Sequence, residues 1–213
     1  MATYESIIKI TGSVGDLVFY NLNGKNVVRK KSGFNKTAFK KNPSYEKVRQ
    51  NSSEFGHCSK IGKIIRGSLD VYIKETGDPL LYQKFAKLMT AIKDCDNISE
   101  RGKRTVENGL KTEDGKKLLK EFRFGDKDNL ATGIEIRENF LSVDKQYDTA
   151  DQLILSTIKL DSEHYTAEHL EEIISLHQQE KLPFKKHFST SDILLHCIIL
   201  KNKNNEITRM GFV

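Results

Sequence analysis

The stretch Val14-Gly-Asp-Leu-Val-Phe-Tyr-Asn-Leu-Asn-Gly-Lys-Asn-Val-Val-Arg29 carries the clearest local signal in the chain. Asn23-Gly24 separates two runs of β-branched and aromatic residues. A type I′ turn favours Asn-Gly there because both central residues need a positive φ. We therefore expect a β-hairpin centred on Asn23-Gly24. We expect Ile7–Thr11 to add a third strand, with Gly12 and Gly15 on either side of a tight turn.

A basic segment follows the hairpin. Ser32–Asn42 reads as a loop in which lysines are interleaved with Phe34 and Phe39. Pro43 suits the first turn of a helix with Asn42 as its N-cap, because that turn lacks intrahelical partners for its N–H groups. Apolar residues at steps of three and four continue the helical pattern. Helices are expected over about Pro43–Lys74, Pro79–Cys95, Asn97–Gly109 and Lys111–Phe122.

The pattern changes near Phe124-Gly125, where short apolar runs begin. One helix is expected among them: Thr166 suits its N-cap, Leu170, Ile173 and Ile174 share a face, and Pro183 follows its end. Strands are expected over Ala131–Ile136, Phe140–Val143, Leu153–Leu160, Ile193–Lys201 and Ile207–Val213.

The fold class predicted from these elements is α+β. An N-terminal β-hairpin and a helical segment precede a strand-rich C-terminal part with one helix, which suits either a β-sandwich or a mixed α+β layer. We place a domain boundary between a basic part, residues 1–123, and an acidic part, residues 124–213.

Charge is distributed unevenly along the chain. Residues 1–66 carry thirteen Lys/Arg and four Asp/Glu, a net charge of +9, whereas residues 125–213 carry ten and fifteen, a net charge of −5. A basic surface attracts polyanions over a Debye length of about 8–10 Å, and it equally attracts an acidic protein surface. The acidic half of a neighbouring copy is one such surface.

The sequence also sets expectations about compartment. Met1–Ile10 lacks the pattern of a signal peptide, and no apolar run approaches the roughly 20 residues needed to span a bilayer. Cys58, Cys95 and Cys197 form no CxxC pair, which is typical of free thiols in a reducing compartment. We expect a cytoplasmic protein, or one that assembles into a particle in the cytoplasm.

Candidate catalytic patterns favour structural interpretations. The segment 62–68 has the glycine spacing of a P-loop but lacks its Lys and falls within an expected helix. His57 and Cys58 lie about 100° apart on a helix, so they do not face each other as base and nucleophile. The acidic pairs Asp126/Asp128 and Glu171/Glu172 are expected to be solvated.

The histidines give no metal pattern. His164, Glu168, His169, Glu172 and His177 match no zinc spacing such as HExxH, so we expect a solvated face. His196 lies in an apolar run and is expected to be a core residue. We therefore predict a non-enzymatic protein with no cofactor and no metal.

Four motifs together resemble a known group. They are Gly15-Asp-Leu-Val-Phe-Tyr with Gly24-Lys-x-Val-Val-Arg, Arg49-x-Asn-x-x-Glu-Phe-Gly56, Arg101-Gly-x-Arg-x-Val-x-x-Gly109 and Leu119-x-x-Phe-x-Phe124. This set is similar to a group of small uncharacterised bacterial proteins with a basic N-terminal hairpin, a helical middle and a variable strand-rich C-terminal part. The resemblance covers about residues 10–125 and implies a two-part layout. The group has no established activity, so it implies no catalytic residues.

The candidate binding residues are basic and aromatic. Lys and Arg contact phosphates, and Phe can stack on unpaired bases. Arg49, Lys60 and Lys63 fall within about 60° of one another on an ideal helix. The predicted polyanion- or partner-binding set is Arg29, Lys30, Lys31, Phe34, Lys36, Phe39, Lys40, Lys41, Arg49, Lys60 and Lys63.

Two non-enzymatic functions stay open. The favoured one is a structural or assembly subunit that forms homo-oligomers or a larger assembly. The small residues Ser53, Gly56, Ser59 and Gly62 allow close backbone approach, and the opposite charges of the two halves favour head-to-tail association. An exposed N-terminal strand can also add to a neighbour's sheet. The alternative is a nucleic-acid-binding protein of low specificity and steep salt dependence.

Overall fold

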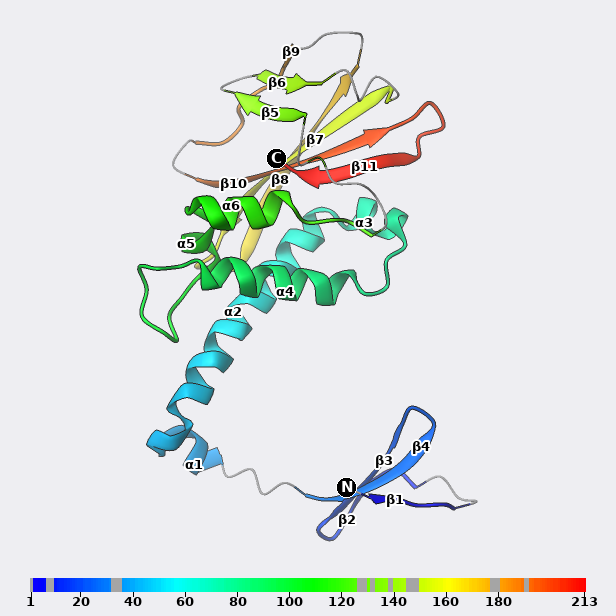
Figure 1. Ribbon diagram of the computed structural model, residues 1–213, viewed down its shortest axis with the longest axis vertical. Helices are drawn as coiled ribbons and strands as arrows, with labels where there is room; N and C mark the ends of the chain where they lie inside the picture. Colours follow the sequence, from blue (N-terminus) through cyan, green and yellow to red (C-terminus); the bar gives the residue numbers. More distant parts are fainter. Residues whose placement is uncertain are drawn as a thin grey trace. The chain divides into compact units, whose positions relative to one another are not determined.

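The computed structural model describes residues 2–6, 10–31, 36–125, 130, 133–137, 140–144, 150–176, 181–189 and 192–213. The fold class is α+β, as predicted, with an N-terminal sheet, a helical middle and antiparallel C-terminal sheets (Figure 1). The chain divides into two compact units, Met1–Glu46 and Lys47–Val213. This division lies far from the boundary between residues 123 and 124 that the sequence suggested.

The first unit contains a four-stranded antiparallel sheet, which we call the N-terminal sheet. Its strands, in the order β1-β4-β3-β2, are β1 (Ala2–Thr3), β4 (Lys25–Lys30), β3 (Leu17–Leu22) and β2 (Gly12–Val14). The predicted hairpin is confirmed, because Asn23 and Gly24 have φ values of 50° and 81°, as a type I′ turn requires.

The third strand differs from the prediction. Residues 7–9 lie outside the described residues, and Ile10 and Thr11 are not in a strand. The strand is β2 instead, which pairs with β3 across a turn at Gly15-Asp16. Gly15 has a φ of 53°, so glycine is favoured at this tight turn.

The basic segment after the sheet is partly helical. The expected loop Ser32–Asn42 contains α1 (Lys36–Lys41), while residues 32–35 lie outside the described residues. The sequence of α1 has no Gly or Pro, so nothing in it opposes a helix. The Asn42 cap is confirmed, since its side-chain oxygen accepts from the Ser44 N–H at 2.9 Å. It caps a short 3₁₀ helix, η1 (Pro43–Tyr45), that leads into the second unit.

The helical middle is shorter than predicted, and the first expected helix, for which a break was allowed, is divided at Leu69. Its helices are α2 (Glu46–Ser68), α3 (Asp70–Thr76), α4 (Leu81–Asp94), α5 (Val106–Leu110) and α6 (Glu113–Lys120). The helix expected over Asn97–Gly109 is wrong for most of its length. There the Asp96 carboxylate accepts from the N–H groups of Ile98, Ser99 and Thr105, which holds the chain in a loop until α5 begins.

The strand-rich part forms two antiparallel sheets. One has the order β11-β10-β7-β8 and the other β5-β6-β9. The strands are β5 (Ile134–Arg137), β6 (Phe140–Val143), β7 (Gln152–Asp161), β8 (Thr166–Ser175), β9 (Lys181–Pro183), β10 (Ile193–Lys201) and β11 (Ile207–Phe212).

The helix predicted after Thr166 is wrong, because this segment is strand β8. All ten residues of β8 pair with β7, from Thr166 opposite Asp161 to Ser175 opposite Gln152. A tight turn joins the two strands, and in it the Asp161 carboxylate accepts from the N–H groups of Glu163 and His164. The spacing of Leu170, Ile173 and Ile174 fits a helix face, but long-range pairing with β7 decides the conformation.

In the second unit, the sheet β11-β10-β7-β8 lies between the helices and the three-stranded sheet (Figure 1). On one face Ile158, Cys197 and Phe212 share a core with the helices. On the other face Leu153 and Ile198 share a core with β6 and β9. Because both faces of β10 are buried, its sequence is a nearly continuous apolar run. The sheet thus shares one core with the helices and another with the three-stranded sheet, which explains why all three layers belong to one unit.

Four phenylalanines join these layers. Phe85 of α4 lies 4.7 Å from Phe122 and 6.3 Å from Phe212, measured between ring centroids, and Phe124 lies 5.4 Å from Phe212. Edge-on and tilted contacts of this kind are favourable beyond the area they bury. Within the described ranges, no helix combines the length and the apolar character needed to cross a bilayer.

Candidate functional site

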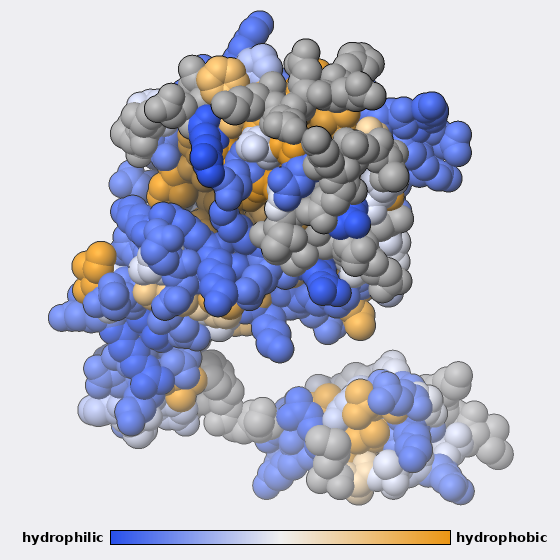
Figure 2. All heavy atoms as spheres, turned by 45° about the horizontal axis from the view of Figure 1, so that its top comes forward, coloured by the Kyte–Doolittle hydropathy of each residue, from blue (hydrophilic) through white to orange (hydrophobic). Residues whose placement is uncertain are grey.

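The N-terminal sheet has little core of its own. Among the described residues of its unit, Val27 is the one buried apolar side chain. Val14, Leu17 and Leu22 remain 65%, 42% and 50% exposed. Figure 2 shows apolar surface among the hydrophilic side chains of this smaller body. Exposed apolar surface on so small a sheet is typical of a binding surface.

The same unit accounts for most of the chain's net positive charge. Residues 1–46 carry eight Lys/Arg and three Asp/Glu, so +5 of the net +6 lies here. Leu17 pairs with Lys30 and Val18 pairs with Arg29, so Arg29 and Lys30 lie on opposite faces of the sheet. Both are exposed, as is Lys31 after them. The basic residues therefore border both faces of the sheet.

Helix α1 carries the next group of predicted residues. Lys36, Lys40 and Lys41 are exposed on it. Phe39 is half-buried and packs edge-on against Tyr45, with ring centroids 5.8 Å apart. Phe34 lies outside the described residues. Stacking of these phenylalanines on bases stays a prediction, and the Phe39 ring already has an intramolecular partner.

The remaining predicted residues belong to the second unit. Arg49, Lys60 and Lys63 lie on α2. The Lys60 ammonium lies 4.2 Å from the centroid of the Tyr165 ring, a cation–π geometry that ties it to the turn between β7 and β8. The structure thus divides the predicted set between two units. A single patch formed by all of them stays a prediction.

A concentrated acidic surface lies on the second unit. Residues 151–175, which we call the acidic hairpin, carry six Asp/Glu and one Lys, a net charge of −5. They form β7, a turn and β8, and β8 is an outer strand of its sheet. Leu170 and Ile173 of β8 are 43% and 65% exposed. Sequence reasoning missed this surface because it predicted a helix here.

Glu171 and Glu172 on β8 are not placed to act together as a general acid and a general base. Tyr72 donates its hydroxyl proton to Glu171 at 2.9 Å, and burial, followed by this hydrogen bond, raises the pKa of Tyr72. Glu172 accepts from the Lys185 N–H at 3.1 Å, and its carboxylate lies 3.2 Å from His187 Nε2. As neighbours in a strand, the two carboxylates point to opposite faces. Asp126 and Asp128 lie outside the described residues.

The structure also separates the histidines that were considered as metal ligands. His164 Nδ1 lies 2.8 Å from Asp161 Oδ2 in the turn. Glu168 and His169 are neighbours in β8, so their side chains point to opposite faces of the sheet. His177 lies outside the described residues. In the part of the chain that is described, no three His, Cys, Asp or Glu side chains are grouped to hold a metal ion.

His57 and Cys58 make unrelated contacts. His57 Nε2 accepts from the Val106 N–H at 3.1 Å and lies 3.2 Å from Glu107 Oε2, while Nδ1 lies 3.2 Å from the Tyr165 hydroxyl. Cys58 is buried, and its thiol donates to the Met89 carbonyl. Burial raises the pKa of Cys58 to about 11, which disfavours the nucleophilic thiolate.

Two further sequence candidates have structural roles. The segment 62–68 is helical, and a Cβ on Gly62 would stand 3.2 Å from Met89 Cγ, so this glycine allows α2 to pack against α4. His196 is half-buried on β10, with Nδ1 3.2 Å from Thr157 Oγ1. Burial lowers the pKa of His196, which favours its neutral form.

Sequence reasoning missed a buried ion-pair cluster around Glu54. This side chain is 3% exposed and accepts from the Gly102 N–H at 2.6 Å, from Arg104 Nε at 2.9 Å and from Lys93 Nζ at 2.9 Å. The Arg104 hydrogen bond is the main cause that lowers the pKa of Glu54 to about 2. The sequence does contain one hint of this cluster, because Glu54 is the only acidic residue between Glu46 and Asp70.

The cluster explains two of the motifs behind the resemblance. Arg101 donates to Asn51 Oδ1 at 3.2 Å, beside the Glu54 contacts. The motif on α2 and the motif over 101–109 therefore hold the loop before α5 against the helix. Their residue types serve the fold, and no reactive group results.

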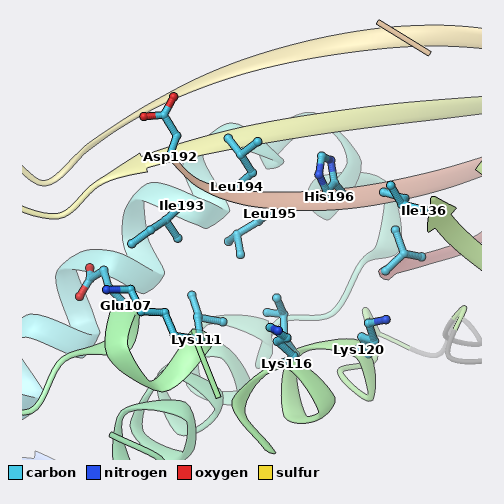
Figure 3. Close-up of a pocket in the computed structure, with 13 residues that line it drawn as sticks. Glu107, Lys111, Lys116, Lys120, Ile136, Asp192, Ile193, Leu194, Leu195 and His196 are labelled. Atoms are coloured by element: carbon cyan, nitrogen blue, oxygen red, sulfur yellow. The ribbon is translucent and has the colours of Figure 1, made fainter. Parts of the chain in front are cut away.

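A cavity of about 550 Å³ lies between α5, α6 and β10. Figure 3 shows Lys111, Lys116 and Lys120 on the helical side, with Ile193 and Leu195 pointing toward them from the strand. Lys116 Nζ lies 2.7 Å from Glu113 Oε1, and Lys111 Nζ donates to Asn108 Oδ1 at 3.3 Å. The lining mixes apolar side chains with lysines and with the acidic Glu107 and Asp192, and it contains no nucleophile–base pair among its described residues.

Comparison with known proteins finds no matching family model, no similar curated protein and no similar solved structure. Function is therefore inferred from the geometry of the chain alone.

Proposed function

We propose that the protein is a non-enzymatic assembly subunit whose N-terminal sheet docks on an acidic protein surface. The observation that carries the proposal is the small core of that sheet, with Val27 buried and Val14, Leu17 and Leu22 exposed. Ordering a residue costs about 1–2 kcal/mol, which apolar burial must offset. A partner that covers these side chains supplies the missing burial.

The charge of the unit indicates the kind of partner. With +5 on residues 1–46, the sheet attracts an acidic surface and repels a second basic sheet. The absence of reactive geometry around His57, Cys58 and Glu171 supports a binding role over catalysis.

The test is light scattering behind size exclusion, at low and moderate salt, on protein freed of nucleic acid. We expect an oligomer that dissociates as salt rises. Val14→Thr with Leu17→Thr keeps β-forming residues but removes exposed apolar surface, so association should weaken. Ile98→Thr is the matched control, because Ile98 is 78% exposed outside this unit. A monomer at high concentration and low salt would overturn the proposal.

Nucleic-acid binding is the second candidate. The observation that favours it is the exposure of Lys36, Lys40 and Lys41 together on the short helix α1. Replacing Lys30, Lys31, Lys40 and Lys41 by Ala should lower affinity for single- or double-stranded nucleic acid. It should also reduce the slope of log K against log salt by roughly one for each phosphate that the variant no longer neutralises. Unchanged binding in this variant would exclude the basic segment as the site.

A further inference from the structure

Strand β8 presents a long and regular edge on which the carboxylates are Glu168, Glu171 and Glu172. It is an outer strand, and among the described residues no strand pairs with its free side. All ten residues pair with β7 without a shift in register, and the strand contains no Lys, Pro or Gly. Proteins usually protect such edges with charged side chains, proline or bulges, because a regular edge is a template for another chain. The charge on β8 is acidic, so it opposes a second acidic edge and admits a basic one.

The hydrogen-bonding pattern shows which groups face outward. The Leu176 N–H donates to the Asp151 carbonyl at 3.2 Å. Antiparallel bonding alternates along a strand, so Leu170 and Glu172 also bond toward β7, whereas His169, Glu171 and Ile173 direct their main-chain N–H and C=O groups outward. A partner strand would therefore pair with residues 169, 171 and 173.

Charge identifies the partner. The acidic hairpin carries −5 and residues 1–46 carry +5. Two N-terminal sheets repel each other, and so do two acidic hairpins, so contact between unlike surfaces is favoured. A second copy of this chain supplies the basic sheet that matches the acidic edge.

The distribution of charge also fits pairing by edges. Arg29 and Lys30 lie on opposite faces of the N-terminal sheet. Glu168 and Glu171, three residues apart in β8, likewise lie on opposite faces of the receiving sheet. Both basic residues lie on β4, which is an inner strand beside the two-residue outer strand β1. When two sheets join edge to edge their faces become continuous, so basic residues and carboxylates then share each face. Docking of one face on the other would use only half of these charges.

We propose that the β8 edge of one copy receives the N-terminal sheet of a second copy by β-strand pairing. This inference rests on the proposed assembly function and names its partner surface. Because the donating and receiving surfaces differ, each copy uses both, and the contact is heterologous. Such a contact produces a ring when the rotation closes and a filament when it does not.

The first test uses His169→Pro, with His169→Thr as its matched control. Proline removes an outward N–H while the ladder to β7 keeps its hydrogen bonds, and edge strands tolerate proline at such positions. Light scattering at low salt should show association weakened at least ten-fold for His169→Pro and unchanged for His169→Thr. Circular dichroism and the unfolding midpoint verify that both variants are folded.

A mixing experiment tests the head-to-tail order. Arg29→Glu with Lys30→Glu removes the donating surface and leaves the receiving edge intact. Mixed with His169→Pro, which keeps only the donating surface, it should give a 1:1 dimer that does not grow. Should His169→Pro fail to fold, Glu168→Lys takes its place, and combining Glu168→Lys with the Arg29/Lys30 reversals in one chain should restore association.

The outcomes separate this inference from the assembly proposal. If the native chain assembles and folded His169→Pro assembles equally well, the β8 edge is excluded while the assembly function stands. If mixing the two defective variants gives no dimer, the head-to-tail contact is overturned. If the native chain stays monomeric at low salt, the assembly function itself is overturned.

Discussion

Glu54 and Arg104, fifty residues apart in sequence, form a two-point ion pair. Arg104 Nε lies 2.9 Å from one carboxylate oxygen of Glu54, and NH2 lies 2.7 Å from the other. Lys93 Nζ approaches the same carboxylate and is itself buried. Glu54 thus shares the buried Lys93 ammonium with Asp94, whose Oδ1 lies 2.6 Å from Nζ, and it also fixes the loop that leads into α5.

Glu54→Gln should therefore destabilise the second unit strongly. The substitution keeps the shape of the side chain but removes the buried carboxylate from Lys93 and Arg104, which then keep only the half-exposed Asp94 carboxylate. Breaking a buried pair costs up to about 3–5 kcal/mol. Urea unfolding followed by circular dichroism measures the change. Glu100→Gln is the control, because Glu100 forms an exposed pair with Lys103 and should change stability by less than about 1 kcal/mol. Equal effects of the two substitutions would contradict this role of Glu54.

The same cluster predicts a loss of stability in acid. The folded-state pKa of Glu54 is about 2, below its ordinary value of 4.5, so ionised Glu54 contributes full stability above about pH 4.5. That contribution declines as the pH falls from 4.5 through 2. Urea midpoints measured between pH 6 and pH 2.5 should fall less steeply for Glu54→Gln than for the native chain. Parallel curves would show that Glu54 is not a source of the acid sensitivity.

Gly109→Ala should be among the most damaging small substitutions. A Cβ at this position would stand 1.9 Å from the Ile92 carbonyl oxygen, so α4 and α5 would have to separate. We expect a loss of at least about 2 kcal/mol by denaturant unfolding, as for other overpacked cores. Gly56→Ala is the control, since no atom lies within 4 Å of its added Cβ and Ala favours the α2 helix by about 1 kcal/mol. A stable Gly109→Ala would show that the two helices have room to move apart.

The cysteines should differ in reactivity by position. Burial raises the pKa of all three thiols, but Cys58 and Cys197 are buried whereas Cys95 is half-buried and therefore more accessible. A thiol reagent at pH 8 should label Cys95 first, and the other two only when urea unfolds the chain. Mass spectrometry of digested samples locates the label. Early labelling of Cys58 would show that α2 and α4 separate in the native protein.

The sequence predicted those elements whose signals are local. Asn23-Gly24 specifies its own turn, and β10 is recognisable because burial on both faces gives a continuous apolar run. Strand β8 was mistaken for a helix because Leu170, Ile173 and Ile174 have helical spacing, and the long-range pairing with β7 overrides that local pattern. The division of the chain was also beyond local patterns, because the core joins Phe85 to Phe212.

The basic residues of the candidate site were predicted, whereas the β8 edge and the contacts of Glu54 were not, because only the former depend on local sequence. The basic residues are visible in the sequence because charge needs no fold to be recognised. The outer edge of β8 exists only after the strand order is set, so no pattern within Thr166–Ser175 could have indicated it. Glu54 is similar, because its partners Lys93 and Arg104 come from distant segments.

The contact between Phe85 and Phe212 has a consequence for synthesis on the ribosome. The helical layer cannot complete its core until Phe212 has been translated and has left the exit tunnel, so most of the second unit folds late. The strands of the N-terminal sheet pair only with one another, between residues 2 and 30, so their pairing does not wait for the second unit. The sheet is therefore available to a partner while the rest of its chain is still being made.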